Sequence, residues 1–292
     1  MRARFCRLLQ ALALAAIVGG WVPGAAGADL FWVGGARGDH IGRATNAGAR
    51  VERSFISGLI EVGTVAASRS HLYWTSGTAI GRANLSGGGI NRAFIRGLGV
   101  LNGVAVAGRY VYWLSDEDPG CGSDPGFGRA RLNGTNVQRG FVCGGGGAAG
   151  IADTLYANGL GIAGKYLYWS WIGGIGRLDT ERRTYDNRFI VLPPGYTVAG
   201  VSAGDGHIYW GSYDLGPLIG RANLDGRRVD TTFIQGLAGN IAPDVLVSHH
   251  HLYFSNDYGS TATIACSSLT GVVEWDFLTQ FHVIGDLTSG PA

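Results

Sequence analysis

The segment Leu72–Leu98, LYWTSGTAIGRANLSGGGINRAFIRGL, returns in nearly the same form at Ile208–Leu237, IYWGSYDLGPLIGRANLDGRRVDTTFIQGL. Both copies hold a Tyr-Trp pair, then Ile-Gly-Arg, and then a phenylalanine twelve residues after the arginine. A phrase of this length that recurs within one chain indicates a repeated supersecondary unit, because such units bury their apolar faces by stacking on one another. The chain is therefore read first as a repeat protein.

Weaker copies bring the number of units to six. The aromatic pair recurs as Phe31-Trp32, Tyr73-Trp74, Tyr112-Trp113, Tyr168-Trp169, Tyr209-Trp210 and Tyr253-Phe254. Its second members lie 42, 39, 56, 41 and 44 residues apart. A period of about 40–45 residues is typical of a four-stranded propeller blade.

Each unit contains four short segments with strand character. A Gly-rich, β-branched segment precedes the aromatic pair, and the Ile-Gly-Arg and Phe-Ile segments follow it. Asn-Gly and Asp-Gly turns separate these segments, and the chain holds 51 glycines. Alternating apolar residues bounded by such turns predict strands, and no sustained helical period follows the first 28 residues. The predicted fold is all-β: a six-bladed β-propeller with four-stranded antiparallel blades.

The repeats resemble the YWTD repeats of low-density-lipoprotein-receptor-type six-bladed β-propellers, in an exported, bacterial-style version. The resemblance rests on LYWTS…IGRANLSG and IYWGS…IGRANLDG and spans the whole chain after residue 28. It implies the propeller fold and a tendency toward binding roles. One departure is that the motif's fourth letter, an Asp that ties blades together in that family, is here Gly35, Ser76, Ser115, Trp171, Ser212 or Asn256. Other polar contacts between blades are therefore expected.

The two ends of the chain are expected to meet. The first unit begins directly at its aromatic strand, and a spare segment follows the sixth unit. Phe281–Ser289 is therefore predicted to supply the innermost strand of the first blade, which closes the ring and removes an exposed edge.

Residues 1–28 are interpreted as a signal peptide, and residues 29–292 as a single propeller domain. Arg2, Arg4 and Arg7 precede an apolar segment that ends in Ala26-Gly27-Ala28, a pattern typical of export signals. The remaining chain has nearly equal numbers of acidic and basic residues and no basic run. A nucleic-acid partner is not expected, because binding to phosphates needs a basic surface. A secreted or cell-envelope protein without a membrane span, and monomeric, is predicted.

Loop lengths point to one face of the disc. The arginine-to-phenylalanine spacing is constant, whereas the connections between strands 2 and 3, and from strand 4 to the next blade, vary. Variable loops on a rigid scaffold are common binding sites, although neutral drift in loop length explains the pattern equally well. Aromatic and carboxylate side chains expected on this face suit sugar or protein contacts: Trp171, Tyr213, Asp214, Asp257 and Tyr258.

Cys121 and Cys143 bracket the two longest connections, both of the third unit, and are predicted to form a disulfide in an exported protein. Cys266 stands where the other units have their arginine and is expected to be a free, part-buried thiol. The acidic residues Asp116, Glu117, Asp118 and Asp124 are read as a solvated loop in preference to a calcium site.

A metal site at the mouth of the central channel is the second reading of the sequence. Glu61, Asn102, Asn158 and Asp244 precede the innermost strands of four units, so their oxygens could converge on a divalent cation such as Ca²⁺. Turn residues exposed to solvent are the favoured interpretation of these four positions.

Two functional hypotheses follow from the sequence. The first is an exported, non-catalytic module that binds a protein or carbohydrate ligand on the face with the variable loops and needs no cofactor. The alternative is a metal-dependent enzyme of the lactonase or lyase type, with its chemistry at the channel mouth. Fold alone does not decide between them.

Overall fold

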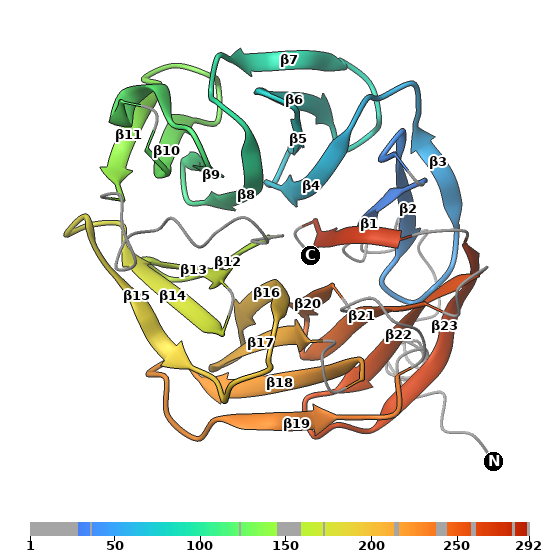
Figure 1. The fold of residues 1–292 in the computed structure, drawn as a ribbon. Helices are drawn as coiled ribbons and strands as arrows, with labels where there is room; N and C mark the ends of the chain where they lie inside the picture. The colour runs from blue at the N-terminus through green and yellow to red at the C-terminus, as the bar shows by residue number, and fades with distance from the viewer. Residues whose placement is uncertain are drawn as a thin grey trace, which may run out of the picture.

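The computed structural model describes residues 29–35, 37–122, 124–144, 159–171, 173–212, 216–237, 244–257, 261–281 and 284–290. They form six sheets of four antiparallel strands, arranged as blades around a central axis (Figure 1). The predicted six-bladed β-propeller is confirmed. Among the described residues the only helical element is the short 3₁₀ turn η2, Pro119–Cys121.

The strands of blades 1 to 3, from the axis outward, are β24 (Ile284–Ser289), β1 (Asp29–Gly34), β2 (His40–Thr45), β3 (Glu52–Ile56); β4 (Val62–Ala67), β5 (His71–Ser76), β6 (Ala79–Asn84), β7 (Asn91–Arg96); β8 (Leu101–Ala107), β9 (Tyr110–Ser115), β10 (Gly126–Arg131), β11 (Gln138–Cys143). Those of blades 4 to 6 are β12 (Leu160–Ala163), β13 (Tyr166–Trp171), β14 (Gly174–Asp179), β15 (Thr184–Val191); β16 (Val198–Gly204), β17 (His207–Ser212), β18 (Leu218–Asn223), β19 (Asp230–Ile234); β20 (Val245–Ser248), β21 (His251–Asp257), β22 (Ala262–Ser268), β23 (Val273–Phe281).

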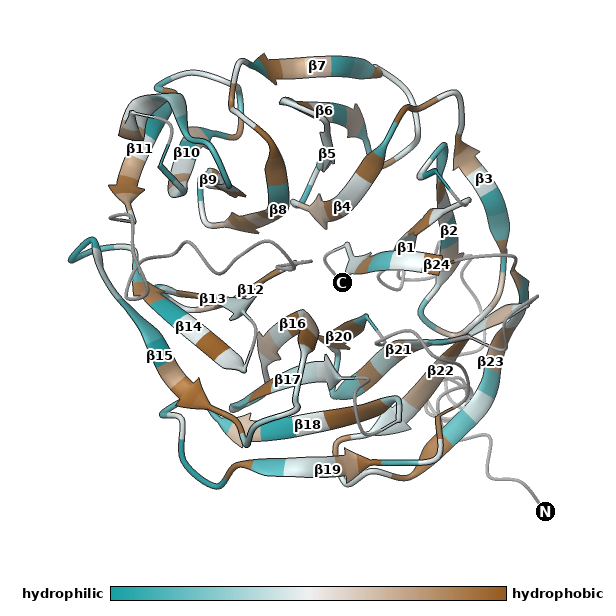
Figure 2. Ribbon diagram, in the orientation of Figure 1, coloured by the Kyte–Doolittle hydropathy of each residue, from teal (hydrophilic) through white to brown (hydrophobic). Residues whose placement is uncertain are grey.

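The ring closes as the sequence predicts. Strand β24 pairs antiparallel with β1, with Trp32 opposite Leu287, so the last strand of the chain completes the first blade. In Figure 2, β24 is drawn directly beside β1 on the axial side of blade 1. A propeller whose first and last segments share one sheet leaves no unpaired strand edge at the junction.

Six hydrophobic clusters hold the blades together, one between each pair of neighbours. The cluster between blades 1 and 2, for example, contains Phe31 and Ile41 from blade 1 and Val65 and Trp74 from blade 2. The aromatic anchors are buried: Tyr73, Tyr168, Tyr209 and all five anchor tryptophans have no exposed surface, and Tyr112 is 5% exposed. Figure 2 shows hydrophilic stretches on the outermost strands, which face solvent.

Polar contacts between blades replace the Asp of the YWTD motif. The Tyr73 hydroxyl and Arg82 Nη1 both donate to the carbonyl of Leu132 in the next blade, at 2.8 and 3.2 Å. The same contact recurs from Arg43 to Leu85 and from Arg221 to Leu269. Each of these arginines also lies about 4 Å from the strand 4 phenylalanine of its own blade, an attractive cation–π arrangement. The constant spacing of twelve residues is therefore the spacing of this pair across one hairpin.

The two faces of the disc differ in their connections. We call the side that carries connections 2–3 and 4–1, such as 77–78 and 97–100, the loop face. We call the side that carries turns 1–2 and hairpins 3–4, such as 68–70 and 85–90, the hairpin face.

Candidate functional site

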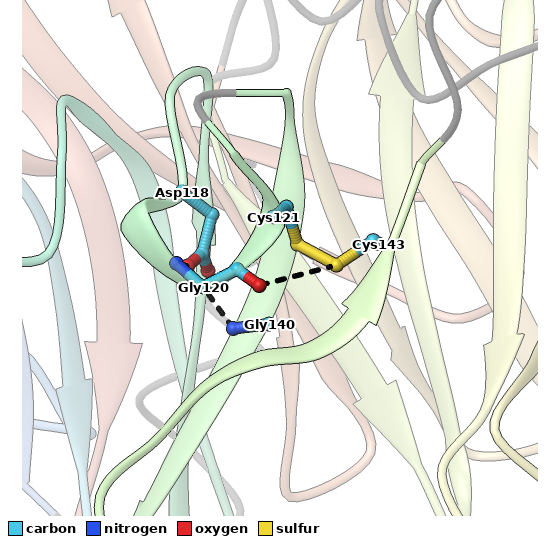
Figure 3. The surroundings of a disulfide bond; sticks show 5 residues. All are labelled: Asp118, Gly120, Cys121, Gly140 and Cys143. Carbon is cyan, nitrogen blue, oxygen red and sulfur yellow. Dashed lines mark hydrogen bonds between the residues drawn. A yellow bond between two sulfur atoms is a disulfide. The ribbon is translucent and has the colours of Figure 1, made fainter.

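The blade 3 connection on the loop face is tied down by the predicted disulfide. Cys121, in η2, is bonded to Cys143 at the end of β11, with their Cα atoms 5.5 Å apart (Figure 3). Beside this bond, the Asp118 carboxylate accepts hydrogen bonds from the N–H groups of Gly120 and Gly140, at 2.8 and 3.0 Å. Asp118 is completely buried, so it is a structural member of the loop. The sequence predicts a solvated acidic loop, and Asp118 departs from that prediction because it is buried.

The expectation for Cys266 is wrong. Cys266 lies on β22 with no exposed surface, it is disulfide-bonded, and none of the described cysteines is free. The prediction of a free thiol rested on setting Cys6 aside with residues 1–28, which lie outside the described residues.

Only part of the predicted ligand-contacting set lies in the described structure. Trp171, at the end of β13, is half-buried, and its buried indole N–H has no hydrogen-bond partner among the described residues. The Arg188 guanidinium lies 5.9 Å from its ring. Asp257 is the last residue of β21, but its side chain is outside the described part of the chain, as are Tyr213, Asp214 and Tyr258. Whether these residues bind a ligand stays a prediction.

The predicted metal-ligand set is partly visible. Asn102 donates its amide N–H to the Asp116 carboxylate, and Glu61 is an exposed residue in the left-handed backbone region, with φ of 50°. Asp244 directly precedes the innermost strand β20, whereas Asn158 is outside the described residues. Among the described residues no three His, Cys, Asp or Glu side chains gather as a metal site. The calcium site stays a prediction.

Asp244 has a neighbour that sequence reasoning missed. In each blade, one residue of the innermost strand pairs with the second aromatic residue of the anchor. The residues that directly precede these six paired residues form a ring around the axis. From blade 1 to blade 6 they are Asp286, Thr64, Gly103, Gly159, Gly200 and Asp244. The two aspartates belong to adjacent blades. The C-terminal segment carried the only sequence signal for this neighbour, because Asp286 directly precedes Leu287, the residue that pairs with Trp32. That segment has no aromatic pair of its own, so the register of Asp286 could not be assigned from the spacing of the repeats.

Burial changes the acidity of both aspartates. It raises the pKa of Asp244 to about 7. Burial also raises the pKa of Asp286 well above its usual value, and the charge of Asp244 raises it further. The Val65 N–H, which donates to Asp286 Oδ2 at 2.6 Å, opposes that rise. Both carboxyl groups therefore stay protonated to a higher pH than exposed aspartates do.

One of the two aspartates lines the central channel. Asp286 lines a cavity of about 200 Å³ whose other walls are the innermost strands. A carboxyl group with a raised pKa in a cavity is a candidate for proton transfer.

The loop face also presents two aliphatic side chains to solvent. Ile60 is 71% exposed and Val100 is 51% exposed, at corresponding connections into blades 2 and 3. Hydrogen bonds to backbone carbonyls hold these connections in place: Ser76 Oγ donates to the Ile60 carbonyl at 2.6 Å, and the Asp116 N–H donates to the Val100 carbonyl at 3.0 Å. Ile60 and Val100 are therefore candidate contact residues on the loop face.

Comparisons with known proteins confirm the fold and leave the function open. No protein-family model and no curated protein matches the chain. Solved structures do match it. The "Nidogen/Laminin Complex" has a TM-score of 0.61 at 18% identity over 91% of this chain and 99% of the other. TolB from Acinetobacter baumannii has a TM-score of 0.64 at 13% identity, covering 97% and 70%. A gluconolactonase from Xanthomonas campestris has a TM-score of 0.55 at 14% identity, covering 77% and 76%.

At such low identities these likenesses concern the propeller fold, which serves both binding proteins and enzymes. Within the described part of the chain, no helix is long and apolar enough to span a membrane.

Proposed function

We propose that this protein is an exported, monomeric binding module that holds a protein or carbohydrate ligand on its loop face. The observation that carries the proposal is the pair of exposed side chains Ile60 and Val100, held on connections that are hydrogen-bonded to their own blades. Exposed aliphatic residues in rigid surroundings lose little conformational entropy on binding, so they favour a protein ligand over a sugar. Trp171, at the loop-face end of β13 in blade 4, is the residue best suited to stack on a sugar ring.

Charge and redox state agree with this proposal. The near-neutral chain after residue 28 offers no basic surface for nucleic acid. The Cys121–Cys143 disulfide suits an oxidising compartment, where such bonds persist. A signal peptide over residues 1–28 is the route by which we expect export, and intact mass of the secreted protein tests cleavage before Asp29.

The test screens residues 29–292 against peptide and glycan arrays, followed by titration of each hit. The double variant Ile60→Asp, Val100→Asp should weaken binding of a true ligand at least tenfold. Val229→Asp, Val272→Asp is the matched control, because those valines are 44% and 54% exposed on the hairpin face. A ligand whose binding is unchanged by Ile60→Asp, Val100→Asp but weakened by Val229→Asp, Val272→Asp would contradict the assignment to the loop face.

A metal-dependent lactonase or lyase is the second candidate, and the acid pair Asp244 and Asp286 is the observation in its favour. A carboxyl group that titrates near neutral pH can serve as a general acid or base. Calcium held by Glu61, Asn102, Asn158 and Asp244 would polarise a substrate carbonyl. Ca²⁺ at millimolar concentration should then raise the Tm by binding to the folded protein alone, and Glu61→Gln with Asp244→Asn should abolish that rise. Lactone hydrolysis that depends on calcium would favour this candidate over the binding module.

A further inference from the structure

Five of the six interfaces between blades close in the same way on the hairpin face. A glycine in the 3–4 hairpin of one blade lies against the strand 4 phenylalanine of the blade before it, as Gly87 does against Phe55 and Gly134 against Phe94. The other three pairs are Gly226 with Phe189, Gly271 with Phe233 and Gly48 with Phe277. These glycines have positive φ, so the tight turn and the close approach both require glycine.

The interface between blades 3 and 4 departs from this pattern. The hairpin of blade 4 reads Asp179-Thr180-Glu181-Arg182-Arg183 and has no glycine. The aromatic ring that a glycine covers elsewhere, here Phe141, instead has two guanidinium groups beside it. Arg129 lies 4.0 Å and Arg183 lies 5.0 Å from its centroid.

Arg129 also lacks the carbonyl acceptor that three of its counterparts use. Arg177 makes no such bond within the described residues either, although its interface keeps the glycine, Gly226. In the hairpin of blade 4, Thr180 occupies the leucine position, as shown by its N–H bond to the Lys165 carbonyl, which matches that of Leu132 to Arg109. Arg43, Arg82 and Arg221 each donate Nη1 to the carbonyl at this leucine position. Arg129 makes one hydrogen bond, from Nε to Gln138 Oε1, so its Nη atoms have no acceptor within the described residues.

A cavity of about 430 Å³ opens where the usual packing is missing. Its walls include Tyr110, Tyr112, Arg129, Lys165, Thr180 and Arg183. Glu181 and Arg183 are exposed at its rim, so the cavity is open to solvent on the hairpin face. This volume lies within the range of pockets for small molecules.

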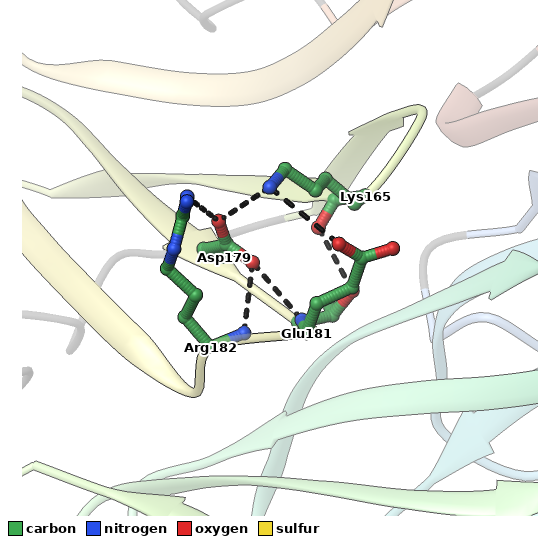
Figure 4. A network of polar contacts seen from close by, with 5 residues as sticks. Lys165, Asp179, Glu181 and Arg182 are labelled. Carbon is green, nitrogen blue, oxygen red and sulfur yellow. Dashed lines mark hydrogen bonds and ion pairs between the residues drawn. The ribbon is translucent and has the colours of Figure 1, made fainter.

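The charges around the cavity are not balanced. Lys165 is paired with Asp179, at 2.9 Å, and with Glu181, at 3.5 Å (Figure 4). Asp179 also accepts N–H groups of Arg182 and Glu181, which together with Lys165 hold its pKa far below the usual range and keep it ionised. Arg129 and Arg183 have no carboxylate partner in the described part of the chain. Two like charges gathered beside one ring leave a local excess of positive charge.

We propose that the cavity between blades 3 and 4 binds a small organic carboxylate, whose anionic group lies between Arg129 and Arg183. Guanidinium groups bind carboxylates through paired, charge-assisted hydrogen bonds, and both arginines have free donors for this purpose. The Tyr110 ring, 4.6 Å from the Arg129 guanidinium, supplies an apolar wall for the body of the ligand. The site is on the hairpin face and is independent of the proposed ligand on the loop face.

The test is calorimetric titration of the protein with benzoate, glucuronate and inorganic phosphate, which are an aromatic carboxylate, a sugar carboxylate and a bare oxyanion. We expect saturable binding of at least one carboxylate. Arg183→Gln should weaken it by about tenfold, the loss expected from one charge-assisted hydrogen bond. Arg183 is exposed, so this variant is expected to fold normally.

Two controls keep the test specific. Arg182→Gln changes a neighbouring exposed arginine that pairs with Asp179 and does not line the cavity, and it should leave binding unchanged. Arg82→Gln removes the counterpart of Arg129 in blade 2, whose Nη1 already has an acceptor, and should also leave binding unchanged. The proposal is overturned if no carboxylate binds saturably, if phosphate binds as tightly as either carboxylate, or if binding survives in Arg183→Gln.

Discussion

The indole of Trp74 on β5 lies so close to Gly81, its partner on β6, that a Cβ on Gly81 would fall 2.2 Å from the indole Cε2. The same contact is present between the anchor tryptophan and the facing glycine in blades 1, 3, 4 and 5. In blade 6, Phe254 is opposite Ala265, so a smaller ring accompanies a larger residue. The anchor ring therefore packs directly on the glycine of the Ile-Gly-Arg motif. A larger residue at the glycine position requires a smaller ring at the anchor position.

We predict that Gly81→Ala lowers the free energy of unfolding by about 1–3 kcal/mol, because it overpacks a filled core. In the background of Trp74→Phe, which copies blade 6, the same change should cost at least about 1 kcal/mol less. A double-mutant cycle in urea measures this coupling. Gly88→Ala is the control, because a Cβ at this exposed position meets no atom closer than 3.9 Å. Additive effects of Gly81→Ala and Trp74→Phe on the free energy of unfolding would contradict this packing relationship.

Tyr73 and Tyr112 occupy the same position in neighbouring blades but differ in their hydroxyl contacts. Tyr73 donates to the Leu132 carbonyl at 2.8 Å, whereas the Tyr112 hydroxyl donates to no carbonyl among the described residues. Tyr73→Phe should therefore cost about 1 kcal/mol of unfolding free energy, the usual value of a neutral hydrogen bond. Tyr112→Phe should cost clearly less. Chemical denaturation of both variants tests the difference, and equal losses would mean that the hydrogen bond contributes nothing.

Closure by β24 predicts a strong effect of a short truncation. Deletion of residues 282–292 removes the strand that pairs with β1 and also the buried Leu287. An open β1 edge favours aggregation, so the truncated protein should elute as oligomers in gel filtration and melt at a lower temperature. A chain that lacks only residues 291–292 is the control. A monomeric truncated protein with an unchanged Tm would rule out the closure.

The acid pair predicts a stability that falls as the pH rises. The pKa of Asp244 is about 7 in the folded protein and about 3.8 in the unfolded chain, so the folded state binds more protons between these values. The contribution of the pair is therefore fully present below pH 3.8 and is lost as the pH rises through 7. Asp286, whose pKa is raised by burial and by the charge of Asp244, changes stability in the same direction.

Thermal melts between pH 4.5 and 8.5 check this prediction. Asp244→Asn with Asp286→Asn should flatten the decline, because Asn can still accept the Val65 N–H and does not titrate. The depressed pKa of Asp179 acts in the opposite direction, with stability lost as the pH falls below 3.8, so this range keeps the two effects apart. An unchanged pH slope in the double variant would assign the decline to other groups.

Much of the fold was predictable because it follows from local repetition. Each blade buries a large ring at one register position, against a glycine on the next strand, and places an arginine beside a phenylalanine across a hairpin. These requirements recur in five of the six units, and blade 6 departs from them with Ala265 and Cys266. They are therefore visible as spacing in the sequence. The Cys121–Cys143 bond was predictable for a related reason, since both cysteines bracket connections that end on the same face of one blade.

The candidate sites were less predictable because they depend on what meets between blades. Asp286 escaped notice because its register is set by pairing with β1, a strand about 250 residues away in the chain. The cavity beside Arg129 arises from a missing glycine in the hairpin of another blade, Thr180–Arg183. Neither feature has a local signature.

The sequence by itself determined the number of blades, the strands within them, the closing segment and the buried aromatic anchors. Each of these follows from interactions within one unit or from the count of units. Only the tertiary structure decided that Asp244 lies beside the carboxyl of Asp286, that Ile60 and Val100 stand in water, and that blades 3 and 4 leave a charged cavity. The physical reason is that desolvation and exposure depend on atoms from neighbouring blades, which the packing of the ring brings together.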